Sequence, residues 1–300
     1  MAKAPPPVRT IGVLGAGTMG HGIAQVAAAA GFKVVLRDID ESAVIRGRQS
    51  IESNLAKGIE RGKVTEQERD NTLARIKTTT DLADLSTVDL IIEAAPESLK
   101  LKQDLLRECE AATEASCIFA TNTSSLSITE IATAAERPEN VIGMHFFNPV
   151  HIMKLLEIVV GERTGNDTTA AVTHVATQMK KEPIVVRDVP GFASSRLGVT
   201  LGLEAMRMVE QGVASARDID TAMELGYNHP MGPLRLTDLV GLDVRLSIAE
   251  YLHSKLGSET FRPPDILRRM VSEGKLGKKT GQGFYDWTDG DKARSAHPVT

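Results

Sequence analysis

The sequence has few of the features that mark a specialised class of protein. Only two cysteines occur in 300 residues, Cys109 and Cys117, and no C-x-x-C, so we expect two reduced thiols, in a helix and a strand, and no disulfide or metal site. No apolar run reaches the roughly 20 residues of a membrane span, and residues 1–7 lack the apolar core of a secretory signal. We therefore expect no membrane partner and, by default, a cytoplasmic location.

An excess of charge of one sign is also lacking. Lysine and arginine total 35, aspartate and glutamate total 39, and a net charge of −4 gives no reason to expect a nucleic-acid partner. Apolar residues make up 42% and charged residues 25%, as in an ordinary globular enzyme. A chain of 300 residues has room for one or two domains. Prolines at positions 5–7 predict a short disordered leader over residues 1–8.

The clearest motif is a glycine-rich turn after an apolar strand over residues 9–14. It matches G-x-G-x-x-G and consists of Gly15, Ala16, Gly17, Thr18, Met19 and Gly20. Gly15 permits the sharp turn, Gly17 lets the backbone approach a pyrophosphate, and Gly20 lets the following helix pack on the strand. The pyrophosphate is expected at the free N–H groups of the helix that starts here.

The surroundings strengthen this dinucleotide site. A second apolar strand is expected over residues 33–36, and Asp38 lies 18 residues beyond Gly20, where an acid meets the adenosine ribose hydroxyls. The alternative is an ordinary strand–turn–helix in which Asp38 caps the next helix. Asp38 favours NAD, whereas the neighbouring Arg37 could tolerate the extra phosphate of NADP.

The order of the elements predicts an α/β fold followed by a helical one. Alternating strands and helices over residues 9–187 predict a doubly wound, mostly parallel Rossmann-type sheet with a helical excursion after the second strand. Pro190-Gly191 marks the boundary, so the domains are 1–187 for the dinucleotide and an all-helical 188–300. Further strands are expected over 88–95, 117–121, 141–146, 155–160 and 183–186, and the second domain's helices over 192–211, 215–225, 233–256 and 264–273.

Four polar residues follow or end strands of this sheet, where ligands of such folds bind: Glu97, Ser124, His145 and Asn148. His145 lies in an apolar frame, as a general base requires. Glu157 is on the next strand, and hairpin-like pairing would bring its carboxylate beside the imidazole to fix the tautomer. The alternatives are a satisfied core histidine or a structural ion pair, and for Ser124 a helix N-cap or an ST-turn.

Two basic segments each have two possible roles. The predicted helix over residues 41–62 carries Lys57 and Arg61, which are four residues apart, and suits either a solvated face or an arm for the phosphates of coenzyme A. Lys278 and Lys279 open a glycine turn near the C-terminus, which is either a surface loop or part of a site.

Together the motifs resemble those of 3-hydroxyacyl-CoA dehydrogenases, especially the short-chain 3-hydroxybutyryl-CoA type. The resemblance extends in order and spacing from residue 9 to 287. It rests on Gly15-Ala-Gly-Thr-Met-Gly20, Asn122-Thr-Ser-Ser-Leu126, His145-Phe-Phe-Asn-Pro149, Met153-Lys-Leu155, Pro190-Gly-Phe192, Pro230-Met-Gly-Pro233, Gly241-Leu-Asp243 and Gly277-Lys-Lys-Thr-Gly-Gln-Gly-Phe-Tyr285.

The resemblance implies roles for individual residues. His145 is the acid–base residue, Glu157 its carboxylate partner, and Ser124 a contact of the substrate's 3-oxygen. Asp38, Glu97, Lys102, Asn148 and Lys279 match cofactor contacts, and Asn54, Lys57 and Arg61 match the arm that meets coenzyme A. One position departs, because Ser195 stands where the family has a catalytic-site asparagine.

The implied function is NAD-dependent oxidation of an (S)-3-hydroxyacyl-CoA, of short chain, or the reverse reaction, in fatty acid or butanoate metabolism. The helical domain is expected to close over the substrate and to form a homodimer. Two alternatives stay open. A dehydrogenase of a free hydroxy acid, of the gulonate or crystallin-like kind, has no need of the basic arm around Lys57. A non-catalytic dinucleotide-binding protein has no need of His145 or Glu157.

Overall fold

The computed structural model describes residues 7–289 and the backbone of 294–295. Most of the expected leader, residues 1–6, lies outside the described residues. The chain divides into two compact units, Met1–Phe192 and Ala193–Thr300, each with its own hydrophobic core. In the part of the chain that is described, no helix is long and apolar enough to cross a membrane.

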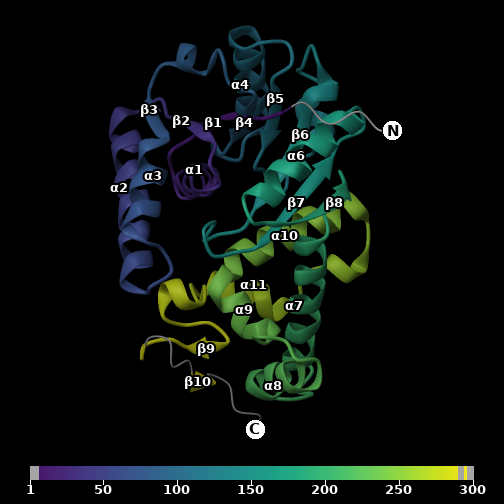
Figure 1. The fold of residues 1–300 in the computed structure, drawn as a ribbon. Coiled ribbons are helices and arrows are strands. Elements are labelled where there is room, and N and C mark those ends of the chain that lie inside the picture. Colours follow the sequence, from purple (N-terminus) through teal and green to yellow (C-terminus); the bar gives the residue numbers. More distant parts are fainter. Residues whose placement is uncertain (1–6, 290–293, 296–300) are drawn as a thin grey trace. The chain divides into compact units, whose positions relative to one another are not determined.

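The first unit is built on one eight-stranded sheet (Figure 1), with the strand order β3-β2-β1-β4-β5-β6-β7-β8. Every neighbouring pair is parallel except β6 and β7, which are antiparallel. The strands are β1 (Thr10–Leu14), β2 (Lys33–Arg37), β3 (Ile76–Thr79), β4 (Leu90–Glu93), β5 (Ile118–Thr121), β6 (Val141–Phe146), β7 (Leu155–Val160) and β8 (Glu182–Arg187). The prediction of a doubly wound, mostly parallel sheet is confirmed.

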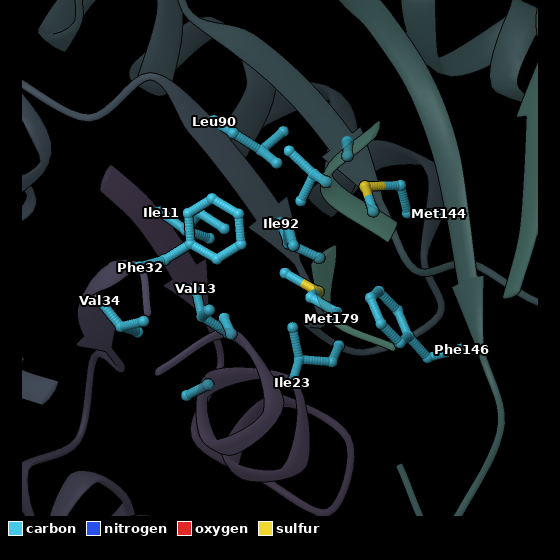
Figure 2. Close-up of a cluster of buried hydrophobic side chains, with 14 of the residues drawn as sticks. Ile11, Val13, Ile23, Phe32, Val34, Leu90, Ile92, Met144, Phe146 and Met179 are labelled. Carbon is cyan, nitrogen blue, oxygen red and sulfur yellow. The ribbon is translucent and has the colours of Figure 1, made fainter. Parts of the chain in front are cut away.

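Helices connect the strands and cover the sheet. They are α1 (Gly20–Ala29), α2 (Glu41–Glu60), α3 (Glu66–Ala74), α4 (Leu99–Ala112), α5 (Ile128–Ala132) and α6 (Asn166–Gln178), with 3₁₀ turns at Leu82–Leu85 and Pro138–Asn140. Figure 2 shows Ile23 of α1 turned toward Val13 and Ile92 of the central strands, in a cluster whose members are almost all fully buried. Because β1 and β4 are covered on both faces, their sequences are continuous apolar runs and show no alternation.

The edge strand β3 is absent from the sequence prediction, which places the third strand at residues 88–95. Its sequence, Ile-Lys-Thr-Thr, buries only Ile76, so no apolar run marks it. The strand forms because parallel pairing with β2 satisfies its backbone, from Val34 opposite Ile76 to Arg37 opposite Thr79. The helical excursion after β2 is present, and α3 begins with the expected capping box of Thr65 and Glu68.

The second unit is helical. Its elements are α7 (Ser194–Glu210), α8 (Ala216–Gly226), α9 (Pro233–Val240), α10 (Leu242–Leu256), α11 (Asp265–Ser272), 3₁₀ turns at Glu259–Phe261 and Lys278–Thr280, and the two-residue strands β9 (Tyr285–Asp286) and β10 (Arg294–Ser295). The single helix expected over residues 233–256 is wrong. Gly241 lies between α9 and α10 and has φ +106°, which no residue of a helix adopts and which favours glycine.

Candidate active site

The candidate site lies at the carboxyl edge of the first unit's sheet. Strands β1, β2, β4, β5 and β6 run parallel, so the segments that follow them meet at one edge. These segments carry the glycine turn, Asp38, Glu97, Ser124 and Asn148. The topology therefore gathers residues that are more than 100 positions apart in the sequence.

The glycine turn has the geometry of a phosphate cradle. Gly15 has φ +91°, and a Cβ on Gly20 would lie 1.7 Å from the Gly15 carbonyl oxygen, so both positions require glycine. A Cβ on Gly17 would meet nothing within 4 Å, so the turn is open on that side. Helix α1 begins here with no side-chain cap, which leaves its first N–H groups for an anion. These residues fit a dinucleotide pyrophosphate.

Asp38 is tied to this turn. Its Oδ2 accepts a hydrogen bond of 2.7 Å from the backbone N–H of Ala16. The alternative role as a helix cap is wrong, because Asp40 caps α2 through a bond from the Ser42 N–H. Arg37 donates from Nε to the Thr80 carbonyl at 3.3 Å, so its side chain is engaged with the chain after β3.

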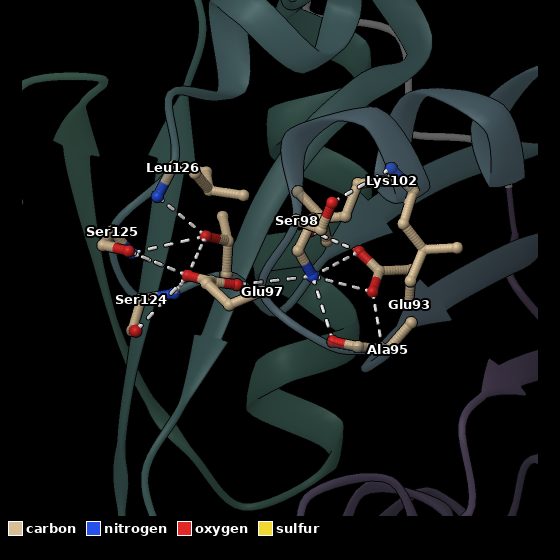
Figure 3. Close-up of polar contacts among 11 residues, drawn as sticks. Glu93, Ala95, Glu97, Ser98, Lys102, Ser124, Ser125 and Leu126 are labelled. Carbon is tan, nitrogen blue, oxygen red and sulfur yellow. Dashed lines mark hydrogen bonds and ion pairs between the residues drawn. The ribbon is translucent and has the colours of Figure 1, made fainter.

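A buried charged network holds the segment after β4 (Figure 3). Lys102, which is 1% exposed, reaches back from α4 to the Glu93 carboxylate at 2.8 and 3.0 Å, and Glu93 is fully buried. The Lys102 ammonium also lies 3.5 Å from Glu97. The resemblance implies that Lys102 is a cofactor contact, and in the structure its ammonium also donates to the Ala95 carbonyl at 3.3 Å.

Glu97 connects this network to the polar turn after β5. Its Oε1 accepts from the Thr123 hydroxyl at 2.6 Å and from the Ser124 N–H at 3.0 Å. Burial raises the pKa of Glu97, but the hydrogen bond from Thr123 and the charge of Lys102 outweigh it, so the net direction is downward. Glu97 is thus a carboxylate at neutral pH. Ser124 itself is exposed and caps no helix, because Ser127 caps α5.

His145 and Glu157 form a buried dyad on the antiparallel strands β6 and β7. They stand directly opposite each other in the register, and His145 Nδ1 lies 2.7 Å from Glu157 Oε2. Their side chains are 9% and 0% exposed. The pairing expected from hairpin geometry is confirmed. Phe147 packs on the imidazole with ring centroids 4.6 Å apart.

The dyad has the arrangement of a base and its orienting acid. With Nδ1 bonded to a carboxylate, that nitrogen carries the proton and Nε2 is the acceptor. Asn148 follows β6 and is exposed. Asn122, whose role sequence reasoning missed, accepts from the Phe146 N–H at 2.8 Å and so links the ends of β5 and β6. Its place directly after a buried strand is a signal that could have found it.

The predicted basic arm is the last part of α2. Asn54 is half-buried and donates to the Gln25 side chain at 3.2 Å. Lys57 and Arg61 are exposed, and the Arg61 N–H bonds to the Lys57 carbonyl, so they are one turn apart. Neither cation has an ion-pair partner within residues 7–289. Both charges are therefore free for an anionic ligand.

The two remaining predicted residues belong to the second unit. Ser195 is half-buried in the first turn of α7. Lys279 lies in a 3₁₀ turn, and its ammonium pairs with Asp243 at 2.5 and 2.7 Å. The same pairing, with the hydrogen bond from Lys279, holds the pKa of Asp243 below its usual range.

Comparisons with known proteins cover both units. The NAD-binding domain of 3-hydroxyacyl-CoA dehydrogenase matches residues 10–189, and the C-terminal domain matches residues 191–287. A probable 3-hydroxybutyryl-CoA dehydrogenase of Deinococcus radiodurans is 46% identical over 92% of this chain and 99% of its own length. The mitochondrial hydroxyacyl-coenzyme A dehydrogenase of Homo sapiens is 41% identical over 93% of this chain and 91% of its own length.

A solved structure agrees with these matches. The crystal structure of (S)-3-hydroxybutyryl-CoA dehydrogenase from Ralstonia eutropha has a TM-score of 0.90 at 43% identity, over 92% of this chain and 98% of that one. The family predicted from the motifs is confirmed. The chain belongs to the 3-hydroxyacyl-CoA dehydrogenase family of oxidoreductases, and its first unit is the NAD-binding domain of that family.

Proposed function

We propose that this protein oxidises an (S)-3-hydroxyacyl-CoA, of short chain such as 3-hydroxybutyryl-CoA, to the 3-oxoacyl-CoA with NAD, or runs the reverse reaction. The single observation that carries the proposal is the buried dyad of His145 and Glu157, 2.7 Å apart, in a unit that also holds a dinucleotide turn. A nicotinamide dinucleotide supplies the hydride chemistry when bound.

The protein supplies the proton chemistry. His145 Nε2 takes the proton of the 3-hydroxyl during oxidation and returns it to the 3-oxygen during reduction. The Glu157 carboxylate stabilises the imidazolium that forms, and because it is fully buried, water screens this interaction little. The exposed Ser124 hydroxyl, which in the structure donates to Glu97 at 3.5 Å, is proposed to donate to the 3-oxygen when substrate is bound; the hydrogen bond from the Ser124 N–H to Glu97 supports this role. Lys102 acts as a positioning residue behind Glu97.

The dinucleotide is proposed to be NAD rather than NADP. Asp38 at the end of β2 offers a carboxylate to ribose hydroxyls and repels a 2′-phosphate. Arg37 does not offset this, because its Nε is bonded to the Thr80 carbonyl. We expect kcat/KM with NADH to exceed that with NADPH by about tenfold or more, the cost of losing one charge-assisted contact. Equal efficiency would show that Arg37 turns to the cofactor.

The substrate is proposed to carry coenzyme A. Lys57 and Arg61, exposed at the end of α2 and without an ion-pair partner among the described residues, support an anionic handle of this kind, which a free hydroxy acid lacks. In the second unit, Ser195 is proposed to face the substrate at the position of the family's asparagine.

The protein is also proposed to be a homodimer. Exposed apolar side chains of α8 and α9 support this, such as Leu225 and Leu236, which are 82% and 41% exposed.

The experiment is reduction of acetoacetyl-CoA followed by the loss of NADH absorbance. The wild-type protein should turn over, and His145→Gln should lower kcat by at least about 100-fold, because general acid–base work contributes on the order of 10²–10⁴. Dinucleotide affinity, measured by NADH fluorescence, should change little. A His145→Gln variant that keeps most of its activity would refute the assigned base, and a wild-type protein inactive with acetoacetyl-CoA but active with free acetoacetate would refute the acyl-CoA assignment.

A further inference from the structure

A lysine of the first unit is buried against backbone carbonyls. Lys181 directly precedes β8 and is 7% exposed. Its ammonium donates to the Val150 carbonyl and, at 2.7 Å, to the Met153 carbonyl. Within residues 7–289, no carboxylate forms an ion pair with it. Burial lowers the pKa of Lys181, and no neighbouring acid opposes this direction.

A charged side chain is a costly choice at this place. Taking an ammonium out of water is unfavourable, and the two carbonyls bring no opposite charge to offset it. A methionine of similar length would fill the same space without this cost. The presence of a lysine is therefore explained by what its two hydrogen bonds hold rather than by packing.

Both carbonyls belong to the loop that joins the two strands of the dyad. This dyad loop, residues 147–154, runs from the end of β6 to the start of β7. Because β7 is antiparallel to β6 and parallel to β8, the end of β6 and the starts of β7 and β8 lie at the same edge of the sheet. This is the carboxyl edge at which the glycine turn also lies. Lys181 therefore holds the dyad loop at the candidate site.

The dyad loop contacts both the base and the dinucleotide helix. Phe147, its first residue, packs on the His145 imidazole with ring centroids 4.6 Å apart. Val150 packs on the first turn of α1, where a Cβ added to Gly22 would lie only 2.8 Å from the Cβ of Val150. Asn148 lies between these two contacts and is exposed. The position of the loop thus determines where His145 and Asn148 lie relative to α1.

The two halves of a dinucleotide lie over different strands of such a sheet. Asp38 follows β2 and the pyrophosphate is expected at the glycine turn after β1, and the strand order then continues with β4, β5 and β6. The nicotinamide half is thus expected over the ends of β4, β5 and β6, beside the dyad loop. We propose that Lys181 is a positioning residue, which holds the dyad loop so that His145 and Asn148 meet the nicotinamide half. This inference rests on the proposed function and adds a residue to its site.

The test compares the binding of NADH with that of ADP-ribose, which lacks the nicotinamide, in wild-type protein, Lys181→Met and Lys180→Met. The measured quantity is the ratio of the Kd for NADH to the Kd for ADP-ribose, from titration calorimetry. We expect Lys181→Met to raise this ratio by about 3- to 10-fold, the worth of one hydrogen bond to the nicotinamide half. Its kcat for acetoacetyl-CoA at saturating NADH should fall by about 10-fold or more, because small misplacements of reacting groups have large effects on rate. Lys180 is exposed, so Lys180→Met should keep the wild-type values.

A second variant leaves the lysine in place. Val150→Ala removes the contact between the dyad loop and α1 and should raise the same ratio to a smaller degree, while circular dichroism and the melting temperature report its folding.

An unchanged ratio in folded Lys181→Met would overturn the inference, including the case where only its melting temperature falls. Equal losses of affinity for NADH and ADP-ribose would overturn it as well. If Lys181→Met does not fold, Val150→Ala decides, because a wild-type ratio in that variant would overturn the inference and a raised ratio would support it. A wild-type protein that binds NADH but does not reduce acetoacetyl-CoA would reject the proposed function, and the two affinities would still test the role of Lys181.

Discussion

Replacing Glu157 by glutamine isolates the contribution of its charge. The side chain keeps its shape, and its amide oxygen can still accept from His145 Nδ1 at the 2.7 Å observed for the carboxylate. The negative charge beside the imidazole is removed, and the second carboxylate oxygen becomes an NH2 donor. Because Glu157 is fully buried on β7, neither solvent nor a neighbouring loop can replace that charge.

The expected magnitude follows from the separation of the charges. Two unit charges with centres about 4 Å apart interact by about 4 kcal/mol at an effective dielectric constant of about 20. If about half of the proton's charge resides on the imidazole in the transition state, the loss is about 2 kcal/mol, or about 30-fold in kcat. This is smaller than the loss expected for His145→Gln, in which the base itself is removed.

The assay is kcat for acetoacetyl-CoA reduction at saturating NADH, with the melting temperature as a measure of folding. Glu182→Gln is the matched control, because Glu182 is an exposed glutamate on the neighbouring strand β8, and its kcat should equal that of the wild type. If folded Glu157→Gln keeps kcat within about threefold, electrostatic stabilisation of the imidazolium is not part of catalysis. If it is more damaging than His145→Gln, the two roles are reversed.

Three further predictions concern other parts of the chain. Replacing both Lys57 and Arg61 by alanine should raise KM for acyl-CoA but not for a truncated thioester without the nucleotide. An equal rise in KM for both substrates would mean that the basic face serves folding. Ser195→Ala should cost about 0.5–1.5 kcal/mol of transition-state stabilisation, one neutral hydrogen bond, and Ser195→Asn should keep or raise turnover; changes in melting temperature alone would make Ser195 structural. Asp238→Asn should destabilise the second unit by about 1–3 kcal/mol, because Asp238 accepts from the Trp287 indole and two backbone N–H groups. Burial raises the pKa of Asp238, so protonation of this carboxyl favours the folded state. The difference in melting temperature between the wild type and Asp238→Asn should therefore increase as pH falls from neutral toward the ordinary aspartate range. A difference that decreases would contradict this.

Much of the site could be predicted because its positions depend on strand ends and strand pairing. The turn at Gly15 and the acid at Asp38 follow from residue spacing alone. The contact of His145 with Glu157 follows from one antiparallel pairing, in which residues of opposite strands meet on the same face. In these cases backbone geometry determines where the side chain lies.

Other features depend on tertiary contacts that have no local signature. Strand β3 carries too few apolar residues to be recognised and exists because β2 offers an edge. The break at Gly241 lies inside an apolar pattern that continues through it. Lys102 near the start of an amphipathic helix looks like a surface lysine, and only the fold shows that it is buried against Glu93.

The antiparallel pair β6–β7 also determines how the contact between His145 and Glu157 can be lost. Side chains alternate between faces along a strand, so a slip of one residue in register would place Leu156 or Ile158 opposite His145 and turn Glu157 to the other face of the sheet. The dyad therefore has no partly assembled state in which the two groups are merely further apart. Amide hydrogen exchange should therefore give one opening free energy for β6 and β7, and the contact between His145 and Glu157 should be lost in the same opening event. Activity should then persist until the conditions under which this part of the sheet unfolds.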